Sequence, residues 1–151
     1  MVRGARSGDV DDIAELFERS FGTLGFLPML HTLEEHRAFF ARVVAEREVW
    51  VWEEEGAVRG FIALGDATVD HLYVEPGMSG RGIGSALLDQ AKTRRPDGFS
   101  LWTFQQNEGA RRFYERRGLR PIRLTDGEGN EEKTPDALYA WRPDSIAGPR
   151  V

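Results

Sequence analysis

Residues 72–84 of the chain read Leu-Tyr-Val-Glu-Pro-Gly-Met-Ser-Gly-Arg-Gly-Ile-Gly, and this stretch decides the fold. Its first residues close an apolar run that predicts a strand, which Pro76 ends. A helix is predicted to follow, because apolar residues recur at helical spacing in Ile83, Leu87, Leu88 and Ala91. Gly80, Gly82 and Gly84 therefore alternate where a strand turns into a helix. Without Cβ atoms they allow positive φ and close approach of a ligand, and the first N–H groups of the helix can bind a phosphate or diphosphate.

Two common phosphate loops do not fit this junction. A P-loop needs Lys after its last glycine, and Ile83 follows Gly82 instead. A dinucleotide-binding fingerprint that starts at Gly80 needs a third glycine where the chain has Ser85. A tight turn alone would account for two glycines, but not for three in alternation before an apolar helix.

The rest of the chain predicts short elements joined by short connections. Predicted strands cover residues 2–6, 49–52, 58–64, 68–74, 99–104, 119–124 and 137–141. Predicted helices begin at caps near Ser7 or Asp9, at the capping box of Thr32 and Glu35, at Ile83 and near Asn107. The order β-α-α-β-β-β-α-β-α-β-β indicates a mixed α/β sheet in a single domain over residues 1–151, with at least one right-handed crossover.

Composition excludes several functional classes. The chain has 151 residues, a net charge of −5 and no cysteine. Disulfides, thiolate metal sites and a cysteine nucleophile are therefore excluded, and binding to nucleic acid through a global positive field is disfavoured. No apolar run approaches the roughly 20 residues that cross a bilayer, and the N-terminus lacks a signal-peptide pattern. We expect a cytoplasmic protein with no membrane or nucleic-acid partner, and the sequence leaves a homodimer open.

Two segments resemble the GNAT superfamily of N-acetyltransferases. Residues 80–88, Gly-Arg-Gly-Ile-Gly-Ser-Ala-Leu-Leu, resemble the acetyl-CoA loop of that family, whose signature is Arg/Gln-x-x-Gly-x-Gly/Ala. Residues 101–119, which run from a strand through a helix to Gly-Leu, resemble its second motif. Ser79 departs from the pattern, since the family usually has Gln or Arg there. The resemblance implies the GNAT fold and acetyl-CoA as co-substrate, with no metal.

The resemblance also assigns the coenzyme contacts by position. The Val74 backbone is expected to pair with the pantetheine arm. Asn107 is expected to contact the same arm at a helix start, where Asn is also a favourable N-cap. The main-chain donors of the loop are expected to hold the diphosphate, and they belong to Ser79, Gly80, Arg81, Gly82, Ile83, Gly84 and Ser85.

Two catalytic roles follow from the same resemblance. The Leu72 N–H lies at the position of an oxyanion donor, and losing such a donor typically costs about 3–4 kcal/mol of barrier. Tyr114 matches the tyrosine that acts as general acid toward the departing thiolate, and a phenol of pKa about 10 is protonated at neutral pH. The alternative for Tyr114 is a core tyrosine packed beside Phe113.

The general base is less well marked. Some relatives use a Glu at positions that correspond here to Thr68 and Trp102, and neither residue can accept a proton in that role. Asp70 is the first candidate, because strand alternation places it on the face of Leu72. His71 is expected to face the other way, and its titration range suits a base only if the strand is bulged there. An exposed Asp-His pair with no catalytic role is the alternative.

The acceptor site is expected to involve the segment between the first two helices, where Phe26, Leu30 and His31 are candidate substrate contacts. The spacing of His31 and His36 fits neither common zinc-helix motif, so we predict no metal there. The acidic segment 126–132 lacks the EF-hand order but can border the acceptor site and attract a cation.

The expected activity is acetyl transfer from acetyl-CoA to a primary amine of a small molecule or peptide, by direct attack in a ternary complex. A catalytically silent acyl-CoA-binding regulatory domain and a protein N-terminal or lysine acetyltransferase are the alternatives.

Overall fold

The computed structural model describes residues 1–143, which divide into two compact units. The first unit, residues 1–94, contains β1 (Val2–Gly4), a 3-10 helix (Ser7–Asp9), α1 (Val10–Phe21), α2 (Leu33–Glu46), β2 (Glu48–Glu54), β3 (Ala57–Leu64), β4 (Val69–Val74) and α3 (Ile83–Arg94). The second unit contains β5 (Phe99–Phe104), α4 (Glu108–Arg116), β6 (Arg120–Leu124) and β7 (Asp136–Trp141). The predicted order of strands and α-helices is confirmed, and the 3-10 helix is an addition to it. Across residues 1–143, no helix combines the length and apolarity that crossing a membrane requires.

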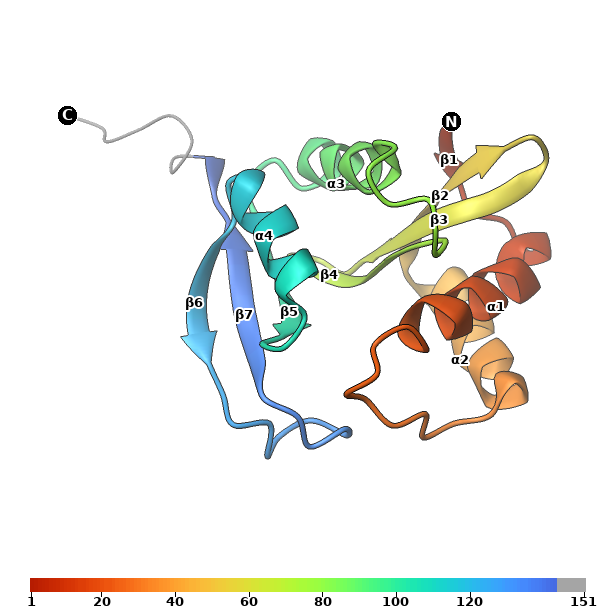
Figure 1. Ribbon diagram of the computed structural model, residues 1–151. Helices are drawn as coiled ribbons and strands as arrows, with labels where there is room; N and C mark the ends of the chain where they lie inside the picture. The colour runs from red at the N-terminus through yellow and green to blue at the C-terminus, as the bar shows by residue number, and fades with distance from the viewer. Residues whose placement is uncertain (144–151) are drawn as a thin grey trace. The chain divides into compact units, whose positions relative to one another are not determined.

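The first unit is a four-stranded antiparallel sheet in the order β1-β2-β3-β4, with helices on both faces. Figure 1 shows α1 and α2 on one face and α3 on the other. The α1–α2 face is held by a buried cluster that includes Ile13, Leu16, Phe40, Val51 and Phe61. On the other face α3 packs closely on β3 at Gly60, where an added Cβ would lie 2.9 Å from Ile83 Cγ2 and 3.1 Å from Leu87 Cδ1. Gly60 thus lets the first turn of α3 approach the sheet.

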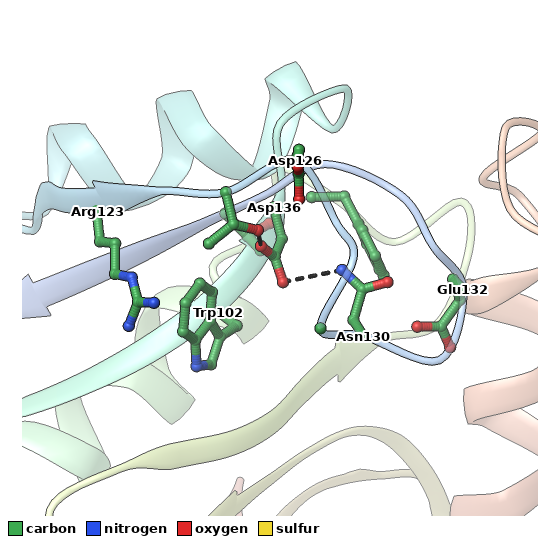
Figure 2. Close-up of a pocket in the computed structure, with 10 residues that line it drawn as sticks. Trp102, Arg123, Asp126, Asn130, Glu132 and Asp136 are labelled. Atoms are coloured by element: carbon green, nitrogen blue, oxygen red, sulfur yellow. Dashed lines mark hydrogen bonds between the residues drawn. The ribbon is translucent and has the colours of Figure 1, made fainter.

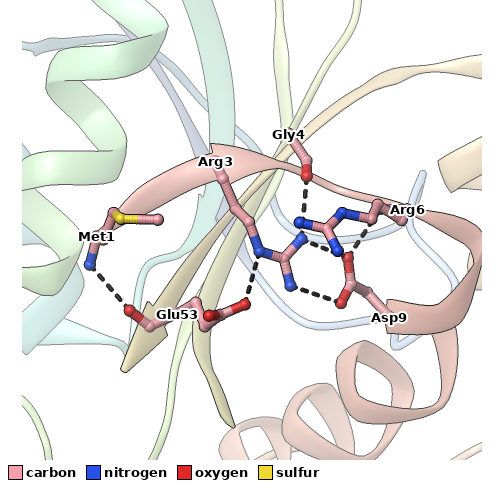
Figure 3. A network of polar contacts seen from close by, with 6 residues as sticks. All are labelled: Met1, Arg3, Gly4, Arg6, Asp9 and Glu53. Carbon is pink, nitrogen blue, oxygen red and sulfur yellow. Dashed lines mark hydrogen bonds and ion pairs between the residues drawn. The ribbon is translucent and has the colours of Figure 1, made fainter. Parts of the chain in front are cut away.

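A charged network fixes the start of the chain to this sheet (Figure 3). Arg3 donates to both carboxylate oxygens of Asp9, at 2.8 and 2.9 Å, and its Nε donates to Glu53 at 2.7 Å. The Arg6 backbone N–H donates to Asp9 as well, at 2.7 Å. Hydrogen bonds from Arg3 lower the pKa of the buried Asp9 carboxyl below its usual value. The network therefore ties β1 and the 3-10 helix to β2.

The second unit is a three-stranded sheet in the order β5-β7-β6. Both β5 and β6 run antiparallel to β7, so they run parallel to each other and α4 is the crossover between them. Asn107 caps α4, since its Oδ1 accepts from the Ala110 N–H at 3.2 Å. Gly118 follows the helix with φ of +90°, as expected for a residue just past a helix end. Tyr139 on β7 anchors α4, because its hydroxyl accepts from Arg111 Nε at 3.0 Å.

Candidate functional site

The loop between β4 and α3 has positive φ at two of the three alternating glycines, Gly80 and Gly82, whereas Gly84 lies within α3. Gly77, Gly80 and Gly82 have φ of +85°, +83° and +84°. A Cβ added at any of the three would meet nothing within 4 Å. Glycine is therefore required at these positions by the backbone conformation and not by close packing against neighbouring atoms. The space beside these residues is open to a ligand.

The loop presents main-chain donors at the mouth of α3. The Ala86 N–H makes the first helical bond, to the Gly82 carbonyl at 3.0 Å. Within residues 1–143, no backbone carbonyl accepts from the N–H groups of residues 79–84. Amides at a helix N-terminus, aided by the helix dipole, favour an anion. This geometry suits a diphosphate.

Ion pairs brace both ends of the loop. Glu75, which precedes the loop, accepts two bonds of 2.8 Å from the Arg19 guanidinium on α1 and lies 3.6 Å from Arg59. Arg81 inside the loop pairs with Glu54 at 3.2 Å. Glu54 therefore holds a guanidinium beside the loop.

One edge of β4 remains open for hydrogen bonding, since β4 is the last strand of its sheet. The Glu75 N–H donates to the Arg59 carbonyl on β3, at 2.8 Å. Because pairing alternates along an antiparallel ladder, the N–H and C=O groups of Leu72 and Val74 point to the open edge. The two backbone positions predicted to contact a ligand therefore direct their N–H and C=O groups to the same edge of β4, away from β3.

A β-bulge interrupts β4 at the predicted base. Ala63 pairs with His71 and Leu64 pairs with Val69, so Asp70 is an extra residue with no partner of its own. Asp70 accepts from Thr68 Oγ1 at 2.7 Å, and its Oδ2 lies 3.9 Å from Nε of Arg47, which follows α2. The prediction that Asp70 shares the face of Leu72 is wrong, because the bulge breaks the alternation and places the carboxylate on the α2 side.

His71 points to the α2 side of β4. Its ring contacts those of Phe39 and Phe40 on α2, with centroids 5.6 and 5.3 Å away, and that of Tyr73 at 6.5 Å. Burial among these rings lowers the pKa of His71 to about 4, against a smaller opposing effect of Asp70. The imidazole is therefore neutral at pH 7 and a weak base.

The second unit contains two tyrosines with different hydroxyl environments. The Tyr114 ring is buried against Phe113 and Tyr139, with centroids 5.4 and 6.1 Å away, and desolvation raises the pKa of its phenol. Among residues 1–143, no group hydrogen-bonds the Tyr114 hydroxyl. The Tyr139 hydroxyl, in contrast, donates to Glu115 and accepts from Arg111. The hydroxyl proton of Tyr114 is therefore not donated to any group within residues 1–143.

Comparison with known proteins places this geometry in a family. Residues 45–120, half of the chain, match the sequence model of the Acetyltransferase (GNAT) domain. The chain belongs to the GNAT family. A peptidyl-lysine N-acetyltransferase of Escherichia coli K12, YiaC, is 34% identical over 99 residues, which are 65% of this chain and 66% of that protein. The matched stretches span between 35% and 66% of the length of the curated relatives.

Solved GNAT structures share the fold. A GCN5-related N-acetyltransferase from Rhodopseudomonas palustris superimposes with a TM-score of 0.79 at 20% identity, over 94% of each chain. The Salmonella typhimurium protein yncA, solved with acetyl-CoA, gives a TM-score of 0.75 at 21% identity, over 100% of this chain and 98% of that one. At these identities the likeness establishes the GNAT fold alone.

The GNAT residues predicted from sequence are distributed over both units. Leu72, Val74 and the loop of residues 79–85 lie together in the first unit, whereas Asn107 and Tyr114 lie on or beside α4 in the second. Asn107 uses its Oδ1 as the cap of α4, so the N-cap function is confirmed and its contact with a pantetheine arm stays a prediction. In residues 1–143, no group of three or more His, Asp or Glu residues could hold a metal ion.

The predicted acceptor residues lie between α1 and α2. Leu30 and His31 are exposed and Phe26 is half-buried. Phe39 on α2 is 41% exposed, in contrast to the buried Phe40 beside it, and its ring contacts that of His71. Leu30 in this segment and Phe39 on α2 are therefore both exposed large apolar side chains.

Sequence reasoning missed a cavity in the second unit of this GNAT chain. Its volume is about 610 Å³, and it lies over β5, the end of β6 and the segment that joins β6 to β7 (Figure 2). Its walls include Trp102, Arg123, Asp126, Asn130, Glu132 and Asp136. The acidic segment was noted from the sequence, but no signal indicated that Arg123 joins it.

Proposed function

We propose that the chain is an N-acetyltransferase that moves the acetyl group of acetyl-CoA onto a primary amine by direct attack in a ternary complex. The observation that carries this proposal is the glycine loop at the mouth of α3. Within residues 1–143 its amides from residue 79 to 84 donate to no backbone carbonyl, and its glycines leave open space beside them. The names of the relative YiaC, a peptidyl-lysine N-acetyltransferase, and of the yncA complex with acetyl-CoA support it.

The residues of the first unit fit the coenzyme. Main-chain donors of Ser79, Gly80, Arg81, Gly82, Ile83, Gly84 and Ser85 would hold the diphosphate. Val74 on the open edge of β4 would pair with the pantetheine amides, and the Leu72 N–H would stabilise negative charge on the thioester oxygen. Asn107 has an amide nitrogen left for the same arm, because only its Oδ1 serves the cap.

Bound acetyl-CoA supplies an activated acetyl group, whose carbonyl carbon gains a C–N bond to the amine as its C–S bond breaks. Two proton transfers accompany this reaction. The amine nitrogen loses one as the amide forms, and the thiolate gains one. Tyr114 would supply the second, because burial keeps its phenol protonated and no group in the described part of the chain hydrogen-bonds its hydroxyl.

Removing the first proton is the harder task. An alkylamine of pKa near 10.4 costs about 4–5 kcal/mol to deprotonate at pH 7. His71 is half-buried among aromatic rings, with a pKa of about 4, which makes it a poor proton acceptor. We propose Asp70 as the carboxylate that relays the proton to solvent, since its side chain is 34% exposed at the bulge of β4.

The test is thiol release from acetyl-CoA with a panel of small amines and with peptides that offer a free N-terminus or a lysine. We expect turnover in the wild type and a kcat about 100-fold lower in Tyr114→Phe, with unchanged acetyl-CoA affinity. A silent acyl-CoA-binding domain would bind the coenzyme and release no thiol with any acceptor. Turnover of peptides alone would favour the protein acetyltransferase.

A further inference from the structure

The cavity of the second unit has a wall built across three strands. Trp102 on β5 and Arg123 on β6 both pair with Leu138 on the central strand β7. The three side chains therefore form one row across the same face of the sheet. The Arg123 guanidinium reaches back along this row and lies 6.0 Å from the centre of the Trp102 ring. Trp102 remains 49% exposed, so an aromatic surface faces the cavity.

A β-bulge aims Arg123 into this row. Pro121 pairs with Tyr139 and Arg123 pairs with Leu138, so Ile122 is an extra residue in β6. Regular alternation would put Arg123 on the face of Pro121. The inserted residue moves it to the opposite face, and bulges re-aim side chains in this way next to binding sites.

The opposite wall is a fixed loop that carries carboxylates. Asn130 donates to the Thr134 carbonyl at 2.7 Å and to Asp136 at 3.1 Å, and Thr125 Oγ1 bonds the other Asp136 oxygen. Gly127, with φ of +89°, passes so close to the Thr134 backbone that an added Cβ would lie 2.3 Å from it. The loop that forms this wall is therefore set before any ligand arrives.

The carboxylates that line the cavity and the guanidinium of Arg123 do not form ion pairs with one another within residues 1–143. Three carboxylates and one guanidinium line it, yet among residues 1–143 Arg123 makes no ion pair. Asp136 is engaged by the loop, and one oxygen of Asp126 accepts from the Glu128 N–H at 3.0 Å. Figure 2 shows Arg123 and Trp102 on one side and Glu132 on the other, with Asp126 between.

A ligand with separated charges of both signs complements this arrangement. An anionic group fits the planar donors of Arg123, since guanidinium binds carboxylate with two parallel hydrogen bonds. A cationic group fits the side of Glu132 and Asp126, where an anion would be repelled. An apolar chain between the two groups can lie along Trp102. A diamine would complement only the acidic side.

We propose that this cavity takes the acceptor and that the acceptor is an aminocarboxylate, whose carboxylate binds Arg123 and whose amine end lies toward Glu132, several atoms away. Omega-amino acids and short peptides belong to this class. The inference rests on the proposed acetyltransferase function, which it narrows from primary amines in general.

The test compares four acceptors of equal length: 6-aminohexanoate, 6-aminohexanamide, hexylamine and 1,6-diaminohexane. We expect kcat/KM for thiol release to be about tenfold higher with the carboxylate than with its amide, as for one charge-assisted hydrogen bond. Arg123→Gln should bring this ratio close to one. Arg116→Gln, an equal change of charge on an exposed residue of α4, should keep the wild-type ratio. Arg123→Lys should give an intermediate ratio, because it keeps the charge without the planar fork.

A wild-type preference for the diamine, or an unchanged ratio in Arg123→Gln, would overturn the inference. Failure of all four acceptors and of the wider panel to release thiol would instead overturn the proposed function. The cavity is then tested by binding alone, through the indole N–H signal of Trp102 in a nitrogen-15 NMR spectrum, assigned with Trp102→Phe. A shift with 6-aminohexanoate that Arg123→Gln abolishes supports the inference, and no shift overturns it.

Discussion

His71 is expected to make the folded protein sensitive to pH in the weakly acidic range. Its imidazole lies among the rings of Phe39, Phe40 and Tyr73, and burial lowers its pKa from 6.5 to about 4. In the unfolded chain the same group titrates near its ordinary value. Between these two pKa values the unfolded chain therefore binds a proton that the folded chain does not.

The sign and size of the effect follow from this difference. Stability rises with pH wherever the unfolded state binds more protons. The contribution of neutral His71 is thus fully present above pH 6.5 and is lost progressively as the pH falls toward 4. With 1.36 kcal/mol per pKa unit, the loss is about 2 kcal/mol at about pH 5 and about 3 kcal/mol at about pH 4.

The measurement is the free energy of unfolding in urea, for the wild type and His71→Phe, at steps from about pH 7.5 to about pH 4. Phenylalanine keeps a ring in the aromatic cluster and removes the titrating group. We expect the stability of the wild type relative to the variant to fall by about 3 kcal/mol over this range. The exposed His31 provides the control, and His31→Gln should follow the wild-type curve.

Groups that do not interact with His71 titrate alike in both proteins and cancel in the difference, which leaves His71 and its interaction with Asp70. A difference that stays flat with pH would refute the reasoning, since it would mean that His71 titrates alike in the folded and unfolded states. A difference that grows in the opposite direction would mean that the folded protein binds the proton more tightly. Either result would also reopen His71 as a proton acceptor in catalysis.

Three further substitutions test the loop and its supports. Gly82→Val should weaken acetyl-CoA binding at least about tenfold in calorimetry. The φ of +84° strains a branched residue, and the valine side chain would fill the open space beside the loop. Unchanged affinity would contradict the assignment of the loop to acetyl-CoA. Gly60→Ala should lower stability by about 1–3 kcal/mol in urea unfolding, because the new Cβ meets Ile83 at 2.9 Å; a neutral result would mean that α3 shifts freely. Asp9→Asn should lose about 1–3 kcal/mol at neutral pH by removing a charged partner of Arg3. Because the folded pKa of Asp9 is lowered, the deficit should persist above its usual pKa of 3.8 and close as the pH falls through its folded pKa; a deficit that does not change with pH would contradict this.

Local patterns predicted those parts of the fold that local physics determines. The capping box at Thr32 forms as predicted, with Glu35 N–H donating to the Thr32 hydroxyl at 3.2 Å and the Glu35 carboxylate accepting from the Thr32 N–H at 2.9 Å. The strand predicted over residues 99–104 has those bounds. The positive φ angles of Gly80 and Gly82 could likewise be predicted, because glycine adopts them without strain, whereas Gly84 lies inside α3. Each feature depends on residues a few positions apart.

Tertiary packing decided what the sequence could not predict. Phe39 and Phe40 both fit an apolar helix face, yet of the two only Phe40 is buried. The Phe39 ring instead contacts His71, which lies on a strand some 30 residues later in the sequence. The burial of His71, and hence its low pKa, depends on that long-range contact. The cavity over Trp102 likewise depends on strand pairing between segments that no local pattern relates.

Two bulges account for the largest differences between expectation and structure. A shift of one residue in strand register moves every following side chain to the other face of the sheet. The alternation of residues in the sequence does not predict such a shift. At Asp70 the extra residue moves a carboxylate away from the face of Leu72, and at Ile122 it turns Arg123 onto the face of Trp102. In both places the bulge changes the position of a charged group without changing the backbone edges that would hold the coenzyme. Under the roles proposed for Asp70 and Arg123, a single insertion in β4 or β6 would change how the acceptor is bound, while the loop at the start of α3 stays constrained by its positive φ angles.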